Sequence, residues 1–267
     1  MKKIAIIGAG NMGYAILRGI TGGGIFSPSA ITVADKSEAC RQRAANEGVA
    51  VTSESGEAVK DAKLIILAVK PNMFDAVAAE IGANISADAV IVSILAGKTL
   101  KTLESAFGEG AKLIRVMPNT PALVGCGMSG ICLNASVSDE EIAEVGKIFG
   151  SFGVARIVDE DMMDTVTGIS GSGPAYAFMF IDGLMKAGVK NGMSESDAKL
   201  FAAQTVLGAA QMVLKNDISP EQLKINVCSP GGTTIEAVKV FEENDLYGII
   251  EKAVDACIAK SKKMSIG

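Results

Sequence analysis

Residues 3–13 read Lys-Ile-Ala-Ile-Ile-Gly-Ala-Gly-Asn-Met-Gly, so a short apolar run leads directly into glycines spaced as Gly-x-Gly-x-x-Gly. The run predicts a buried strand, and the residues after it predict a helix. Gly8 would permit a tight turn, Gly10 would let the backbone approach a diphosphate, and Gly13 would let the helix lie close to the sheet. The free N–H groups of the helix start would then bind that diphosphate. A purely structural turn in an unrelated α/β protein is the alternative. The predicted cofactor contacts here are Ile7, Gly8, Ala9, Gly10, Asn11, Met12 and Gly13.

Short apolar runs alternate with helical segments through the rest of the first 160 residues. The run at 64–69 is apolar on both faces, which is typical of a central parallel strand covered by helices on both sides. The alternation therefore predicts a Rossmann domain over residues 1–160, with a doubly wound and mostly parallel sheet. The predicted strands are 3–8, 31–34, 49–51, 63–69, 89–93, 112–117 and 128–133.

The second half of the chain changes character. Residues 161–267 contain no convincing strand, so we predict an all-α domain over this range. The segment 198–214 is apolar on nearly every side, and a helix of that kind needs partners all around it. We expect this domain to pack against a second copy of itself, which would make the protein a homodimer and allow a larger homo-oligomer. A self-contained helical bundle is the alternative.

Composition excludes several classes of protein. The 267 residues carry a net charge of −5 with scattered basic residues, so a nucleic-acid partner is not expected. There is no histidine and no Cys-x-x-Cys pair among the five cysteines, so no metal site is predicted. Widely spaced, unpaired cysteines suit reduced thiols in a cytoplasmic protein. No apolar run reaches the roughly 20 residues that a membrane-spanning helix needs.

Further cofactor contacts are expected at the carboxyl ends of the predicted strands. Asp35 follows the second strand at the spacing of a ribose-binding acid, which favours NADH, whereas Lys36 could offset its charge and admit the phosphate of NADPH. Both cofactors therefore stay open, and both residues could instead belong to a solvated turn. Three more strand ends could close over the nicotinamide, or could be ordinary turns, and they contribute Ala68, Val69, Lys70, Pro71, Ala96 and Asn119.

A second glycine-containing loop lies in the helical half. Residues 229–234 read Ser-Pro-Gly-Gly-Thr-Thr and precede a helix. N–H groups that converge at a helix start bind anions, and a carboxylate is the natural guest. The alternative is an ordinary helix start capped by a threonine. Ser172, in the loop 168–176, could line the same pocket or belong to a small-residue hinge. The predicted substrate contacts are Ser229, Gly231, Gly232, Thr233, Thr234 and Ser172.

With these motifs in place, the chain resembles pyrroline-5-carboxylate reductases over its full length. The resemblance rests on five segments in the same order and spacing, namely 7–13, 68–71, 115–121, 171–176 and 227–234. It implies that NADPH or NADH reduces 1-pyrroline-5-carboxylate to L-proline, and that the helical domain interleaves with a partner subunit. It further implies that the 229–234 loop holds the substrate carboxylate and that Thr234 hydrogen-bonds the ring nitrogen. Asn226 and the 68–71 segment would lie against the cofactor. Ser55 stands where some members have asparagine, which weakens a cofactor contact there.

Two other functions compete with this one. A β-hydroxyacid dehydrogenase would need a lysine on the helix after a Gly-x-Gly loop, but Ala177 stands four residues past Gly173, and Lys186 lies too far along. A non-catalytic redox sensor that binds NAD(P) would not need a carboxylate-binding loop. In the reductase the ring nitrogen can take its proton from water, so Thr234 is expected to orient the substrate rather than to act as an acid.

Overall fold

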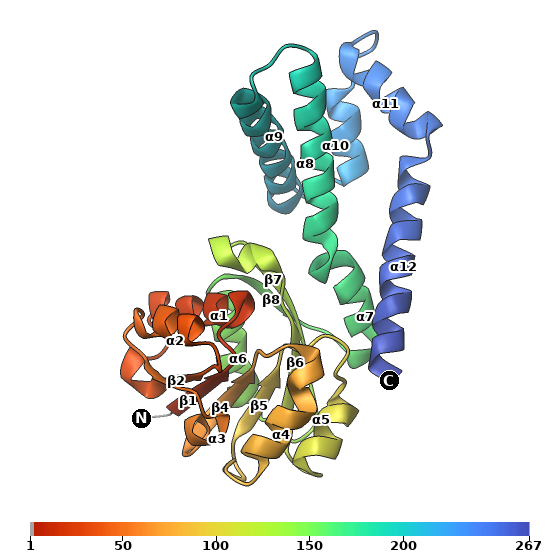
Figure 1. Cartoon of the computed structure of the whole chain (residues 1–267). Coiled ribbons are helices and arrows are strands. Elements are labelled where there is room, and N and C mark those ends of the chain that lie inside the picture. Colours follow the sequence, from red (N-terminus) through yellow and green to blue (C-terminus); the bar gives the residue numbers. More distant parts are fainter. Residues whose placement is uncertain (1–2, 267) are drawn as a thin grey trace. The chain divides into compact units, whose positions relative to one another are not determined.

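One eight-stranded sheet organises the first part of the chain. The computed structural model describes residues 3–266. The strand order is β3-β2-β1-β4-β5-β6-β7-β8 (Figure 1), and six of the seven pairs of neighbouring strands are parallel. The pair β6–β7 is antiparallel. The strands are β1 (Lys3–Ile7), β2 (Ile31–Ala34), β3 (Ala50–Thr52), β4 (Ala62–Leu67), β5 (Val90–Ser93), β6 (Lys112–Met117), β7 (Gly127–Leu133) and β8 (Gly153–Ile157).

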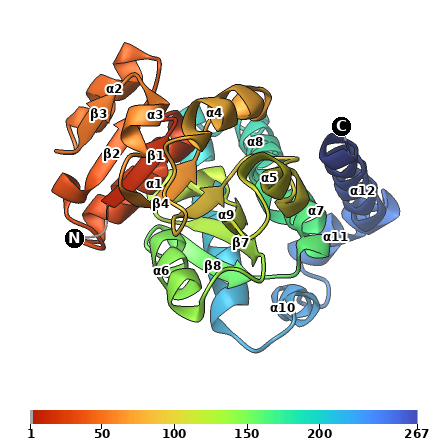
Figure 2. The same ribbon diagram turned by 90° about the horizontal axis from the view of Figure 1, so that it is seen from below.

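Helices cover both faces of this sheet (Figure 2), as the doubly apolar strands require. On one face α1 and α6 pack against side chains such as Ile6 and Val92, and on the other α4 and α5 pack against Ile7 and Ile91. The predicted Rossmann fold is therefore confirmed. The helices of this part are α1 (Asn11–Gly22), α2 (Glu38–Ala45), α3 (Ser55–Ala58), α4 (Phe74–Gly82), α5 (Leu100–Phe107) and α6 (Asp139–Gly150).

The order of the strands reverses between β1 and β4. From β1 the chain proceeds outward through β2 and β3, and it then returns to place β4 on the other side of β1. In open α/β sheets ligands bind beyond the carboxyl ends of the strands at such a switch point. Gly8 and Ala68 follow β1 and β4, so both lie at this position.

The eighth strand was not predicted. β8 is short, and Val154 and Ile157 are exposed, so it lacks the continuous apolar run of a buried strand. It pairs in parallel with β7 at the edge of the sheet, and an edge strand has only one neighbour to bury its side chains. The predicted strand 63–69 also extends two residues beyond the end of β4 at Leu67. Ala68 already turns out of the strand, with its N–H donating to the Ile7 carbonyl at 2.8 Å.

Helices make up the described chain after β8, as predicted. A short helix, α7 (Met163–Val166), continues through a π-helical turn at Thr167–Gly171. The long elements that follow are α8 (Gly173–Lys190), α9 (Glu195–Lys215), α10 (Pro220–Val227), α11 (Thr233–Glu243) and α12 (Leu246–Ile266).

The contacts divide the chain into two compact units. The first contains the residues up to Ser172 together with those from Cys257 onward, and the second spans Gly173–Ala256. We call them the sheet unit and the helical unit. The end of α12 belongs to the sheet unit, where the Ser261 hydroxyl donates to Asp164 Oδ1 at 2.5 Å. The functional division at residues 160 and 161 stays a prediction.

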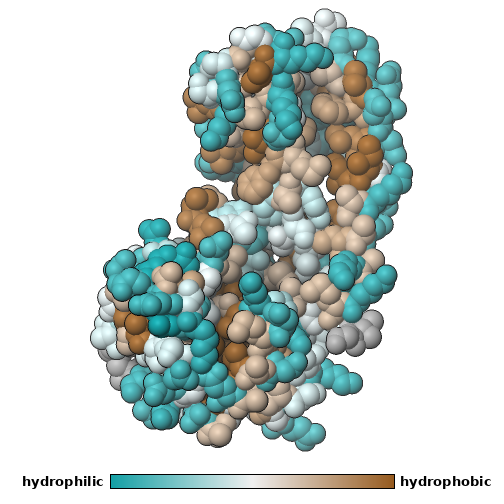
Figure 3. Space-filling view, viewed as in Figure 1, coloured by the Kyte–Doolittle hydropathy of each residue, from teal (hydrophilic) through white to brown (hydrophobic). Residues whose placement is uncertain are grey.

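Large apolar side chains are exposed on the helical unit. The solvent-exposed fraction is 60% or more for Phe178, Met179, Leu200 and Phe201, and it is 84% for Leu214. Figure 3 shows brown, hydrophobic patches on the surface of the helical unit. Within residues 3–266, no helix is both long enough and apolar enough to cross a membrane. An exposed apolar surface of this extent is typical of a protein–protein interface.

Candidate functional site

The glycines of the 8–13 loop have surroundings that differ from one position to the next. Gly8 has φ = +100°, and a Cβ atom there would lie 2.7 Å from the Ala68 carbonyl carbon. A Cβ on Gly13 would lie 2.0 Å from the Gly8 oxygen, so α1 approaches the turn more closely than any side chain allows. At Gly10 no heavy atom lies within 4 Å of the Cβ position. The structure therefore leaves open space at the residue past which a diphosphate would approach.

The start of α1 has the properties of an anion site. Gly10 is the N-cap residue, and no described side chain caps the helix. The first N–H groups of a helix have no partner within the helix, and the helix dipole places partial positive charge there. No acidic residue occupies the first turn of α1. The residues present at this helix start therefore fit the diphosphate of a dinucleotide.

Asp35 lies directly beside this loop. Its Oδ2 accepts the Ala9 N–H at 2.7 Å, and its Oδ1 accepts the Ser37 N–H at 2.8 Å. Asp35 therefore fixes the glycine loop and the turn after β2, and its contact with an adenosine ribose stays a prediction. Lys36 is engaged elsewhere, because its Nζ lies 3.4 Å from Glu54 Oε2 and 3.7 Å from Glu80 Oε1.

Arg43 on α2 also holds the glycine loop, although no sequence motif singles it out. The Arg43 Nη2 donates to the Ala9 carbonyl at 2.6 Å, and its guanidinium lies 4.3 Å from the centre of the Tyr14 ring. The Tyr14 hydroxyl donates to Glu47 Oε1 at 2.6 Å, and this bond is the main cause that raises the pKa of Tyr14. In the sequence, only the position of Arg43 on the helix after β2 could have pointed to this contact.

The other predicted strand ends lie in the sheet unit as well. The 68–71 segment follows β4 and touches the glycine loop through Ala68. Ala96 precedes Gly97, whose φ is +74° and whose Cβ position lies 2.9 Å from Met264 Cβ. The Asn119 side chain is used internally, because its Nδ2 donates to the Ser170 carbonyl at 3.1 Å and its Oδ1 accepts the Met128 N–H at 2.8 Å. A direct cofactor contact by any of these residues stays a prediction.

The 229–234 loop forms a turn at the start of α11 in the helical unit. Gly231 has φ = +69°, and the Gly232 N–H donates to the Ser229 carbonyl at 2.9 Å. The N-cap residue is Gly232, and no described side chain caps the helix. The alternative of a threonine-capped helix is therefore wrong, because Thr233 and Thr234 already lie inside the helix. The first N–H groups of α11 are left for an anion, as they are in α1.

Two of the predicted site residues have hydrogen-bond partners that lie outside the sequence motifs. Asn226 lies on α10, and its Oδ1 accepts a hydrogen bond from Gln222 Nε2 at 2.9 Å. Ser172 ends the π-helical turn, where its Oγ lies 3.1 Å from Cys257 Sγ. The cofactor residues up to Pro71, together with Ala96, Asn119 and Ser172, thus belong to the sheet unit. Asn226 and the 229–234 loop belong to the helical unit.

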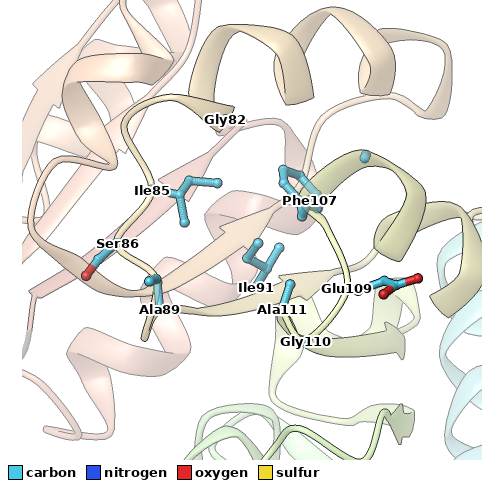
Figure 4. Close-up of a pocket in the computed structure, with 11 residues that line it drawn as sticks. Gly82, Ile85, Ser86, Ala89, Ile91, Phe107, Glu109, Gly110 and Ala111 are labelled. Carbon is cyan, nitrogen blue, oxygen red and sulfur yellow. The ribbon is translucent and has the colours of Figure 1, made fainter.

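A cavity of about 430 Å³ lies away from these residues, between the ends of α4 and α5. Ile85, Ile91 and Phe107 point into it in Figure 4. It opens at the amino ends of β5 and β6, whereas the glycine loop follows the carboxyl end of β1. Its side chains are mostly apolar or small, Ser86 and Glu109 are the polar contributors, and none of the lining side chains is basic.

Known proteins match both parts of the chain. A family model described as pyrroline-5-carboxylate reductase dimerisation matches residues 160–264, and one described as NADP oxidoreductase, coenzyme F420-dependent, matches residues 3–97. The chain is 44% identical to pyrroline-5-carboxylate reductase of Escherichia coli, across 99% of this chain and 98% of the relative. It is 40% identical to the Arabidopsis thaliana enzyme of the same name, across 98% and 95%. The crystal structure of Plasmodium falciparum pyrroline carboxylate reductase with NADP bound matches with a TM-score of 0.91 and 35% identity, and covers 99% of this chain and 98% of that one.

Proposed function

The chain belongs to the pyrroline-5-carboxylate reductase family, and on that premise we propose that it reduces 1-pyrroline-5-carboxylate to L-proline, the last step of proline biosynthesis. The observation that carries the proposal is a pair of helix starts of the same design. Each of α1 and α11 follows a glycine turn, and no side chain among residues 3–266 caps either helix. One suits the diphosphate of a nicotinamide dinucleotide, and the other suits the carboxylate of an imino acid.

The cofactor is a nicotinamide dinucleotide, since the model that matches residues 3–97 is that of an NADP oxidoreductase and a relative binds NADP. When bound, its reduced ring supplies the hydride for the reaction. In our proposal, Ile7–Gly13 hold the diphosphate and Asp35 faces the adenosine ribose. Ala68, Val69, Lys70, Pro71, Ala96 and Asn119 complete the part of the cofactor site that the sheet unit supplies.

The 229–234 loop orients the imine. The N–H groups at the start of α11, with Ser229, Gly231, Gly232 and Thr233, hold the carboxylate. The Thr234 hydroxyl hydrogen-bonds the ring nitrogen. A hydride added to the C=N carbon leaves the electron pair on nitrogen, and the proton comes from water. Since this chain has no histidine, its contribution is positioning rather than strong acid catalysis.

The helical unit serves as a dimerisation domain. The family model that matches this unit is described as a dimerisation domain. Contact with a second copy would bury the apolar side chains that the helical unit exposes to solvent. We further propose that larger homo-oligomers form from this dimer. We place the protein in the cytoplasm, because all five of its cysteines are free.

Oxidation of the reduced cofactor tests the function. The purified protein is mixed with NADH or NADPH, and the absorbance of the reduced nicotinamide is followed with and without 1-pyrroline-5-carboxylate. We expect loss of absorbance that requires the imine, with proline as the product. A parallel reaction with 3-hydroxyisobutyrate and the oxidised cofactor tests for a β-hydroxyacid dehydrogenase. Cofactor binding without any turnover of the imine would identify a sensor instead and would overturn the proposal.

A further inference from the structure

The 229–234 loop has few contacts that hold it in place among residues 3–266. Ser229, Pro230 and Gly231 are exposed, and no heavy atom lies within 4 Å of the Cβ position on Gly231. The hydrogen bond from the Gly232 N–H to the Ser229 carbonyl lies inside the loop itself. The position of this loop therefore depends on α10 and α11, the two helices that flank it.

The far end of α11 is held by side chains of two other helices. The first N–H groups of a helix point along its axis, so their direction depends on how the other end is held. Phe241, in the last turn of α11, packs against Phe180 of α8, with the two ring centres 6.4 Å apart. The next residue, Glu242, pairs with Lys224 of α10. Both contacts lie about 13 Å along the axis from the start of α11, at 1.5 Å per residue.

The Lys224 side chain joins three helices of the helical unit. Its Nζ lies 3.0 Å from Glu221 Oε1 on α10 and 3.1 Å from Glu242 Oε1 on α11. The same atom lies 6.0 Å from the centre of the Tyr247 ring on α12. Hydrogen bonds to Glu221 and Glu242 raise the pKa of Lys224, so the ammonium group is charged throughout the neutral range. We call these four residues the Lys224 bridge.

A second ion pair on α11 supplies a comparison, because both of its partners lie on that one helix. Lys239 Nζ lies 2.7 Å from Glu236 Oε1, three residues away, and the Lys239 side chain is 54% exposed. The Lys224 side chain is 27% exposed, and its pair with Glu242 joins residues 18 apart in the chain. The pair within α11 can support the helix but cannot orient it, whereas the pair between helices can.

Resting on the proposed function, we infer that Lys224 is a positioning residue for the reduction of the imine. It holds the far end of α11, so that the N–H groups at the start of this helix meet the substrate carboxylate. Partly exposed ion pairs contribute little to the stability of a fold, so this role concerns orientation. Loss of the bridge should weaken binding of the imine and leave the cofactor unaffected, because Ile7–Gly13 belong to the sheet unit.

Steady-state kinetics of the full-length protein test the inference. We expect Lys224→Met to raise KM for 1-pyrroline-5-carboxylate by about three- to fivefold, which is what an ion pair of this exposure can supply. The Kd for NADP⁺, measured by titration calorimetry, should stay within about twofold of the wild-type value. Lys239→Met is the matched control and should leave both constants unchanged. An unchanged KM in Lys224→Met, an equal rise in Lys239→Met, or a parallel loss of NADP⁺ binding would overturn the inference.

Further variants assign the effect to the contact between the two helices. Glu242→Gln removes the partner on α11 and should raise KM as Lys224→Met does, and the double variant should be no worse than either single one. Glu221→Gln removes the partner within α10 and should leave KM near the wild-type value, so an equal effect there would contradict a role through α11. Lys224→Arg keeps the cation and should restore most of the affinity. Circular dichroism shows whether Lys224→Met folds, and if it does not, Glu242→Gln carries the test.

Amide hydrogen exchange tests the orientation of the loop without turnover. We expect the peptide that covers residues 228–236 to exchange about three- to fivefold faster in Lys224→Met than in wild type or in Lys239→Met. If wild type does not reduce the imine, the proposed function fails, but hydrogen exchange still tests the Lys224 bridge. If wild type reduces the imine, and Lys224→Met keeps both its KM and its exchange rates, the function stands and the inference fails.

Discussion

Gly13 and Gly22 belong to the same helix, and the structure places them in opposite surroundings. A Cβ on Gly13 would overlap the Gly8 carbonyl oxygen, whereas nothing lies within 4 Å of the Cβ position on Gly22. We expect Gly13→Ala to lower the free energy of unfolding by about 3 kcal/mol, because backbone on both sides must move. Gly22→Ala should change it by less than about 1 kcal/mol, in the stabilising direction. Denaturant unfolding of the two variants measures the difference, and equal effects would show that α1 does not approach the turn closely.

Thr234 carries the proposed contact to the substrate nitrogen. Thr234→Ala and Thr234→Val remove the hydroxyl, and we expect kcat/KM for the imine to fall by about tenfold or more, as for the loss of one hydrogen bond to a reacting group. Thr234→Ser keeps the hydroxyl and serves as the matched control, with most of the activity retained. Circular dichroism shows that each variant is folded. Wild-type kinetics in Thr234→Val would remove this residue from the site.

At the scale of elements, one buried ion pair joins three segments of the sheet unit. Arg115 on β6 is 2% exposed, and its Nη1 lies 3.2 Å from Glu160 Oε1. The same oxygen accepts the Leu100 N–H at the start of α5 at 2.7 Å. Glu160 therefore connects β6 and α5 to the segment that follows β8.

Removal of Glu160 would leave the Arg115 cation buried without a counter-charge. We expect Glu160→Ala to lower the free energy of unfolding by about 3 kcal/mol. This value is the lower end of the range for removing one partner of a buried ion pair, because the Glu160 side chain is 32% exposed. Arg115→Met in the same background should recover part of the loss, because the unpaired charge is then gone. Urea unfolding of the single and double variants tests this. Simply additive losses would mean that the pair contributes no coupling.

For the molecule as a whole, the exposed apolar helices require a partner. Leu200 on α9 is 64% exposed to solvent, and we expect the partner subunit to bury it in the dimer. Leu200→Glu would bury a charge there, so the variant should lose dimer mass in light scattering coupled to gel filtration. Val154→Glu is the matched control, since Val154 is 53% exposed but lies on β8 in the sheet unit. A monomeric wild type, or an unchanged mass for Leu200→Glu, would contradict a dimer through this face.

The sequence alone predicted the features that depend on neighbours along the chain. The glycine spacing at 8–13 defines a turn and a helix start, because each glycine acts on backbone a few residues away. Most strands and helices were placed in the same way, from the period of their apolar residues. The 229–234 loop was found from its composition, although only the structure showed that Gly232, and not a threonine, begins α11.

Tertiary structure decided everything that joins distant residues. Strand β8 forms because β7 offers a free edge, not because its own side chains favour burial. The end of α12 reaches Asp164 from 97 residues away. Glu54 and Glu80 lie within ion-pair distance of Lys36 only because the sheet order brings the turn after β2, the start of α3 and α4 together. Local patterns fix the conformation of a segment, whereas the pairing of charges depends on which segments the fold places side by side.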